Sequence, residues 1–190
     1  MTRIMATVIN FEARALARLQ QRVAEVEEAN EDLIAFARGH SGTVSSIHAA
    51  VLAAMEADGL DHLIHIVTQD WPELLGVDAV ALALVAGDKG LRADLSGMQF
   101  VDPRLLDRSI SDIAAITLRS CGRGHPLFGA AAEMIRTEAL VRLDNPAPFP
   151  TGLLALGQRT TQSFDTSHGS ELLVFLGATL SRMMGRWLLA

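Results

Sequence analysis

The sequence predicts an α+β protein in which a long N-terminal helix precedes an antiparallel sheet flanked by helices. No glycine or proline interrupts residues 9–37, which is typical of an unbroken helix. Short apolar segments separated by turn residues follow between residues 78 and 158, and residues 170–188 again have the periodicity of a helix. Helices first, then a run of strands and finally a helix favour an α+β fold with a mostly antiparallel sheet.

The composition suits one domain of ordinary size with an extra element. Of the 190 residues, 49% are hydrophobic and 20% are charged, so a sizeable core can form. The net charge of −6 argues against a protein that coats nucleic acid. The single cysteine, Cys121, excludes an intrachain disulfide and fits a cytoplasmic location. Arg182 and Arg186 interrupt the most apolar stretch, residues 172–190, so no membrane partner is expected.

The N-terminal helix, assigned to residues 1–40, carries a heptad pattern typical of a dimeric coiled coil. Apolar residues recur in alternating steps of three and four, and an asparagine at a position a favours two parallel strands. The same stripe also suits one amphipathic helix that packs on its own domain, so pairing between or within chains stays open. The residues predicted to form the dimer seam are Leu16, Leu19, Val23, Val26, Asn30 and Leu33.

Gly39 and Gly42 are predicted to end this helix and to form a hinge before a domain over residues 43–190. Two helices are expected next, over residues 44–57 and 60–75, and Pro72 is expected to bend or divide the second.

The strand signals begin at residue 78. Residues 78–85 and 91–95 flank a glycine-containing turn and predict a β-hairpin. Asp102 and Pro103 have the residue types that start a short helix. Further strands are expected over residues 113–118, 136–143 and 152–158, with helical turns over residues 127–133.

The C-terminal helix has a broader apolar face than packing on one sheet requires. This surplus predicts that a partner helix covers part of it, which adds Leu180, Met184 and Trp187 to the dimerisation residues. A membrane-surface role is the minor alternative, because basic residues are few on this helix.

Two stretches of the sequence resemble a known family. They are Pro126-Leu-Phe-Gly129 with Ile135-Arg-Thr-Glu-Ala-Leu-Val-Arg-Leu143, and the segment from Gly152 to Trp187. They are similar to the bacterial family called domain of unknown function 484, a GAF-like domain behind an N-terminal helix. The resemblance implies a GAF-like antiparallel sheet and covers roughly residues 44–188.

In GAF-like folds a small molecule, where one is bound, lies over one sheet face under a segment between the middle strands. By resemblance that segment is residues 119–136. Its mixture of an aromatic ring, guanidinium groups and a carboxylate suits a small polar or anionic ligand. The candidate pocket residues are Cys121, Arg123, His125, Phe128, Arg136 and Glu138. The alternative is that Phe128 belongs to the core and the arginines are solvated.

Cys121 and His125 also raise the hypothesis of a thiol-dependent redox enzyme, because neighbouring basic groups can lower a thiol pKa. Some GAF-superfamily enzymes reduce free methionine sulfoxide with cysteine chemistry, but this chain has no second cysteine to resolve the intermediate. His62 and His65 lack further metal ligands, so neither a metal nor a cofactor is expected.

We therefore expect a non-catalytic, homodimeric sensory or interaction domain that binds a small molecule or a protein partner. No output domain is expected within the chain, so a signal would pass to another protein. The remaining alternative is a scaffold whose pocket is filled by its own side chains, with Phe100 and Phe128 packed onto the sheet.

Overall fold

The computed structural model describes residues 11–144, 151–161 and 169–188. Contacts between residues divide the chain into two compact units, Met1–Ser41 and Gly42–Ala190.

Helix α1 spans Phe11–Met55, so the predicted end of this helix at Gly39 and Gly42 is wrong. A glycine inside a helix costs only about 1 kcal/mol relative to alanine, and the helix-forming residues on both sides outweigh that cost. In the first unit, Val23 and Val26 are 54% and 68% exposed. Asn30 is also exposed, and the side chains of Leu16, Leu19 and Leu33 lie outside the described part of the structure.

The second unit contains one six-stranded, entirely antiparallel sheet with the strand order β3-β2-β1-β6-β5-β4. This confirms the predicted α+β fold with an antiparallel sheet. The strands are β1 (Ala79–Ala86), β2 (Lys89–Asp94), β3 (Gly97–Val101), β4 (Ile116–Ser120), β5 (Thr137–Leu143) and β6 (Thr151–Gln158).

The predicted hairpin is β1 and β2, joined through Gly87, whose φ of +57° favours glycine. Strand β3 was not predicted, and β4 begins at Ile116 rather than at residue 113. Ile113 is buried, but it precedes the strand.

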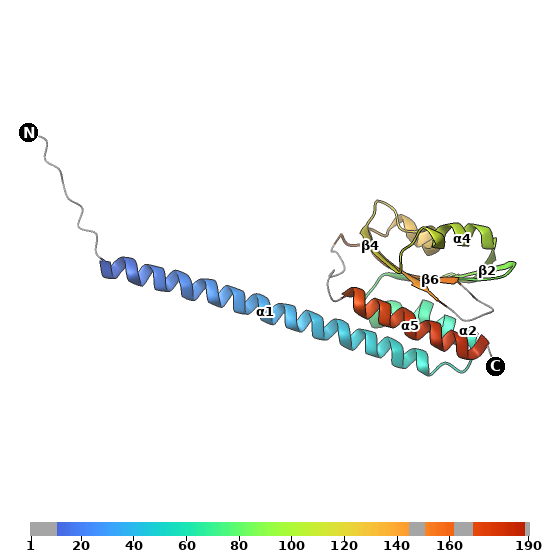
Figure 1. The fold of residues 1–190 in the computed structure, drawn as a ribbon, viewed down its shortest axis with the longest axis horizontal. Helices are drawn as coiled ribbons and strands as arrows, with labels where there is room; N and C mark the ends of the chain where they lie inside the picture. Colours follow the sequence, from blue (N-terminus) through green and yellow to red (C-terminus); the bar gives the residue numbers. More distant parts are fainter. Residues whose placement is uncertain (1–10, 145–150, 162–168, 189–190) are drawn as a thin grey trace, which may run out of the picture. The chain divides into compact units, whose positions relative to one another are not determined.

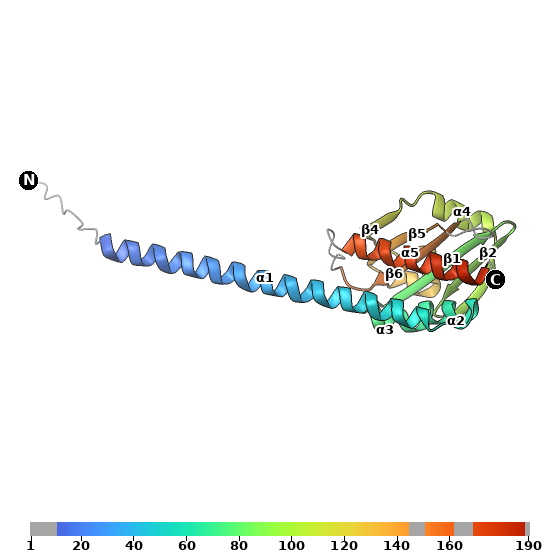
Figure 2. The ribbon, with the colours of Figure 1, turned by 60° about the horizontal axis from the view of Figure 1, so that its bottom comes forward.

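One face of the sheet is covered by helices from both ends of the second unit. The predicted helix over residues 60–75 consists of α2 (Leu60–His65), the π-helix η1 (Ile66–Asp70) and α3 (Trp71–Leu75). Together with the last turns of α1 and with α5 (Gly169–Leu188), they lie on the same side of the sheet (Figures 1 and 2).

The larger hydrophobic core lies between these helices and the sheet. Trp71 is 1% exposed and donates its indole N–H to the carbonyl oxygen of Ala50 in α1 at 3.0 Å. Leu180 and Met184, which were predicted to form a dimer contact, are fully buried in this core. Their side chains therefore pack inside the domain, because they point from α5 towards the sheet, and of the three C-terminal dimer candidates only Trp187 remains partly exposed.

The opposite face carries a smaller core under α4 (Pro103–Ser111) and the 3-10 helix η2 (Pro126–Glu133). As predicted, Asp102 caps α4, and its carboxylate accepts the backbone N–H of Arg104 at 2.9 Å. Figure 1 shows α4 on the side of the sheet away from α5.

Candidate functional site

The predicted pocket residues meet where the loop after β4, η2 and the start of β5 come together on the α4 side of the sheet. Strands β4 and β5 are paired so that Arg119 lies directly opposite Glu138. This pairing places the guanidinium of Arg119, which is not one of the predicted pocket residues, at the centre of the region.

Glu138 is fully buried and holds two segments together. Its Oε1 accepts hydrogen bonds from the guanidinium of Arg119, with the Nε and Nη2 atoms both at 2.7 Å. Its Oε2 accepts the backbone N–H of His125 at 2.6 Å. A buried carboxylate is tolerated only when it is paired and hydrogen-bonded, so Glu138 has a structural task here.

His125 caps the start of η2. Its Nδ1 accepts the backbone N–H of Leu127 at 3.2 Å, which requires an unprotonated nitrogen. Burial lowers the pKa of this imidazole, although the nearby Glu138 charge acts in the opposite direction. The ring is therefore neutral at physiological pH.

Cys121 is half-buried, and its thiol lies 3.8 Å from the carbonyl oxygen of Ile135. Burial raises the pKa of this thiol, and the charge of Glu138 raises it further, against the opposing effect of Arg119 and Arg136. A nucleophilic cysteine needs a lowered pKa, so this environment is the reverse of an activating one.

The two predicted arginines have different surroundings. Arg136 donates from Nη1 to the carbonyl oxygens of Gly122, Glu133 and Ile135 at 3.1, 2.8 and 2.9 Å. Arg123 pairs with Glu133 at 3.0 Å on the open surface. Arg136 therefore fastens the loop to η2, whereas Arg123 is solvated.

Phe128 is 2% exposed and belongs to the core between η2 and the sheet. Phe100, by contrast, is 79% exposed. Of the two phenylalanines predicted to pack onto the sheet in a self-filled scaffold, only Phe128 does so.

Ile135 and Phe128 pack so closely on two glycines that added methyl groups would collide. A Cβ at Gly157 would lie 2.7 Å from Ile135 Cδ1, and a Cβ at Gly124 would lie 2.7 Å from Ile135 Cβ. These glycines are therefore required by close packing.

We expect Gly157→Ala and Gly124→Ala each to lower the free energy of unfolding by about 1–3 kcal/mol through overpacking. Ile135→Val removes Cδ1 but keeps Cβ, so it should relieve the clash at Gly157 and not the one at Gly124. Urea denaturation of the two double-mutant cycles measures this difference. Equal relief at both glycines would contradict the packing described.

Arg92, Asp94 and Gly129 form a further, partly buried cluster that was not predicted. The guanidinium of Arg92 pairs with the carboxylate of Asp94, and a Cβ at Gly129 would collide with Arg92 Nη2. Burial acts to raise the pKa of Asp94, but hydrogen bonds from Ser96 and Arg92 outweigh it and keep the pKa below its ordinary value. This pair could have been predicted from the sequence, because Arg92 and Asp94 are two residues apart and such residues lie on the same face of a strand.

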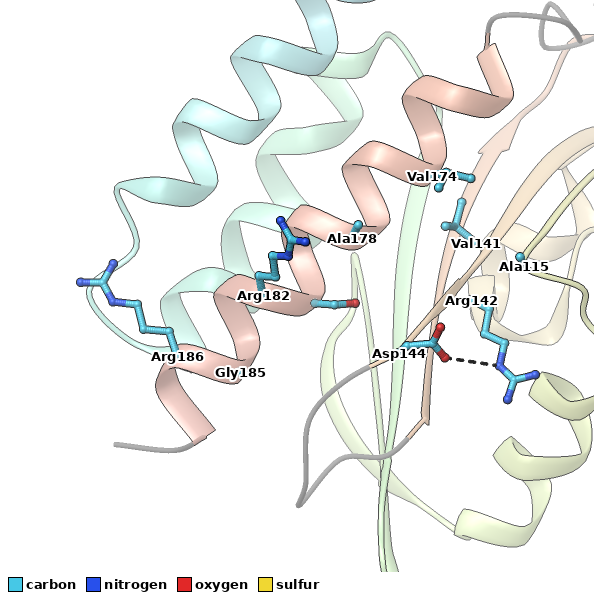
Figure 3. A pocket seen from close by; sticks show the side chains of 10 residues that line it. Ala115, Val141, Arg142, Asp144, Val174, Ala178, Arg182, Gly185 and Arg186 are labelled. Carbon is cyan, nitrogen blue, oxygen red and sulfur yellow. Dashed lines mark ion pairs between the residues drawn. The ribbon is translucent and has the colours of Figure 1, made fainter.

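A groove of about 530 Å³ lies on the other side of the sheet, between α5 and the end of β5. Its floor is mainly apolar, and it includes the buried Ser181, whose hydroxyl has no hydrogen-bond partner in the described structure. Figure 3 shows that Arg142 extends from the strand side, whereas Arg182 and Arg186 extend from α5 in other directions. The charged groups do not converge on one point, and none of the predicted pocket residues lines this groove.

Within the described ranges, no three His, Cys, Asp or Glu side chains are close enough to hold a metal ion together. His62 instead lies 2.8 Å from the carboxylate of Asp58 on the surface. In the part of the chain that the structure describes, no helix combines the length and the apolar character needed to cross a bilayer.

Comparison with known proteins gives a family and a fold. The family model described as "Protein of unknown function, DUF484" matches residues 2–189, and no curated protein matches the chain. The structure is similar to the GAF domain of a phosphoenolpyruvate-protein phosphotransferase from Coxiella burnetii. The TM-score is 0.55 and the identity is 12%, covering 77% of this chain and 94% of that chain.

Two further solved structures that are similar to this chain are also GAF domains. A GAF domain from A. aeolicus in an inactive state has a TM-score of 0.53 at 9% identity, covering 76% of this chain and 96% of that chain. The GAF domain of a two-component sensor histidine kinase from Bacillus halodurans has a TM-score of 0.51 at 14% identity, covering 68% of this chain and 96% of that chain. At such identities the likeness shows the fold alone, which is that of a GAF domain.

Proposed function

The chain belongs to the family described as protein of unknown function DUF484, and we propose that it is a non-catalytic sensory or interaction module that works as a homodimer. The GAF fold carries this proposal, because the similar domains include those of a sensor histidine kinase and of a phosphotransferase. A module of this kind signals when a ligand or partner favours one of two arrangements of its helices.

The chemistry of the candidate residues supports a role without catalysis. The pKa of Cys121 is raised, and the Nδ1 atom of His125 is occupied by a backbone N–H. A thiol-dependent reductase resembling the methionine sulfoxide enzymes would need an activated thiol, and here burial and the charge of Glu138 outweigh the effect of Arg119 and Arg136 on the pKa of Cys121.

The exposed apolar side chains of α1 support pairing of two copies of the chain through the first unit. Val23 and Val26 occupy seam positions of the heptad and are both exposed, whereas Leu180 and Met184 are used inside the domain. Burying such a seam against a second helix removes apolar surface from water. We therefore place the dimer contact on α1 rather than on the buried face of α5.

A partner-binding scaffold is the second candidate, because the predicted pocket residues Glu138, Arg136 and Phe128 are engaged in contacts within the domain. Native mass spectrometry of freshly purified protein separates the two candidates. A dimer that carries a discrete extra mass supports a small-molecule sensor, and a bare dimer supports the scaffold. A bare monomer would overturn homodimerisation.

We expect Val26→Glu to raise the dimer dissociation constant at least about 100-fold, because each copy would place a carboxylate in an apolar seam. Sedimentation equilibrium at several concentrations measures the constant. Glu25→Gln is the matched control, since Glu25 lies at heptad position c outside the seam and is also exposed. Equal effects of the two substitutions would refute the seam assignment.

A further inference from the structure

Strand β3 is an edge of the sheet without the usual protection. It pairs with β2 on one side, and no backbone hydrogen bond to any other described segment is made from residues 97–101. Its sequence, Gly-Met-Gln-Phe-Val, contains no charged residue and no proline. Natural edge strands are usually blunted by charges, prolines or bulges, because their free N–H and C=O groups accept another strand.

The side chains of this edge are also unusually apolar. Phe100 is 79% exposed, Met98 is 43% exposed, and Leu95 in the preceding turn is 52% exposed. Register places Phe100 opposite Leu91 and Met98 opposite Ala93, so both point to the helix-covered side of the sheet. The helices on that side leave these two side chains in water.

The opposite edge of the sheet, strand β4, does carry a charged residue. Strand β4 carries Arg119, and its guanidinium is bound to the buried Glu138. A contact between β3 of one copy and β4 of another would also be heterologous and would generate open chains of molecules. Pairing of β3 with an identical strand avoids both problems.

We propose that β3 pairs antiparallel with β3 of a second copy, around a two-fold axis at Gln99, so that the sheet continues across both molecules. This register places Phe100 of each copy beside Met98 of the other, and methionine sulfur contacts aromatic rings favourably. The strand brings no charge into the contact, which matters in a chain with a net charge of −6.

The contact is small. A five-residue strand buries less than the roughly 800 Å² per partner of a stable interface, so the pairing is weak when it acts alone. This contact is separate from the homodimer proposed above, because β3 forms it and α1 does not take part.

Disulfide trapping tests the register directly. In a Cys121→Ser background the chain has no other thiol, so Gln99→Cys supplies one cysteine per copy. Residues facing each other across antiparallel strands have Cα atoms about 4.5–5.5 Å apart, which is within disulfide range. We expect oxidation of this full-length variant to give at least about fivefold more crosslinked dimer than Leu105→Cys, a 60% exposed control position on α4.

Two added substitutions separate this contact from the α1 dimer. Phe100→Lys should abolish the excess crosslinking without lowering the melting temperature, because the side chain is exposed. Val26→Glu should leave the trapping above the control even if it abolishes the α1 dimer. Crosslinking of Gln99→Cys no greater than that of Leu105→Cys, or unaffected by Phe100→Lys, would overturn the β3 pairing whatever the outcome for α1.

Discussion

Replacing Trp71 with alanine is expected to lower the free energy of unfolding by about 3–5 kcal/mol, the largest loss we expect from a single aromatic side chain of this protein. Trp71 is 1% exposed and lies in the core that joins α1, α3 and α5 to the sheet. Its indole also donates to the Ala50 carbonyl oxygen at 3.0 Å, so alanine removes apolar packing and a hydrogen bond together.

The chain offers a matched control, because it contains two tryptophans. Trp187 is partly exposed, and its ring lies 5.4 Å from the guanidinium carbon of Arg186. Trp187→Ala should therefore cost less than Trp71→Ala. Urea denaturation followed by circular dichroism measures both without relying on tryptophan emission. A larger loss at Trp187 would show that the main core does not depend on Trp71.

Elements with strong local signals could be predicted from the sequence. The helix α5 has a long apolar period, α4 has an Asp102 cap followed by Pro103, and the β1–β2 hairpin has a glycine turn. In each case the residues that decide the structure are neighbours along the chain, so local preference and tertiary packing agree.

The errors arose where local preference and the fold disagree. Gly39 and Gly42 suggested a break, but the helix continues because its neighbours favour helix on both sides. Strand β3 was missed because it has only five residues, and only Met98, Gln99 and Phe100 alternate between apolar and polar types. The sequence signal of a strand is such an alternation over about four to eight residues, and this segment is too short to give it.

The candidate site shows a different limit. Glu138 was predicted to line a pocket because of its charge, yet its structural role depends on Arg119, which lies opposite it on the neighbouring strand β4. Strand register joins residues that are far apart in the chain, and no short turn connects β4 to β5 to fix it, because η2 lies between these strands. A charged residue in a predicted pocket and a buried structural carboxylate therefore look alike in the sequence.

That structural task makes Glu138→Ala the second large effect, with an expected loss of about 2–3 kcal/mol in the free energy of unfolding, the upper part of the range for a buried donor left without its acceptor. The substitution leaves the His125 N–H buried without an acceptor and releases the Arg119 guanidinium, which is already half-exposed. The lost acceptor dominates the cost, because Arg119 can turn towards water whereas the backbone amide cannot.

Two further substitutions test the structural role of Glu138. Glu138→Gln keeps part of its hydrogen bonding, and Glu133→Ala removes an exposed carboxylate as a control. Glutamine keeps an acceptor oxygen for one of the two contacts, so it should cost less than alanine. Glu133 pairs with Arg123 across open surface, and its loss should change the free energy of unfolding by no more than about 0.5 kcal/mol. If Glu138→Ala were as mild as Glu133→Ala, the carboxylate would be free of a structural task, and its place in a ligand pocket would regain support.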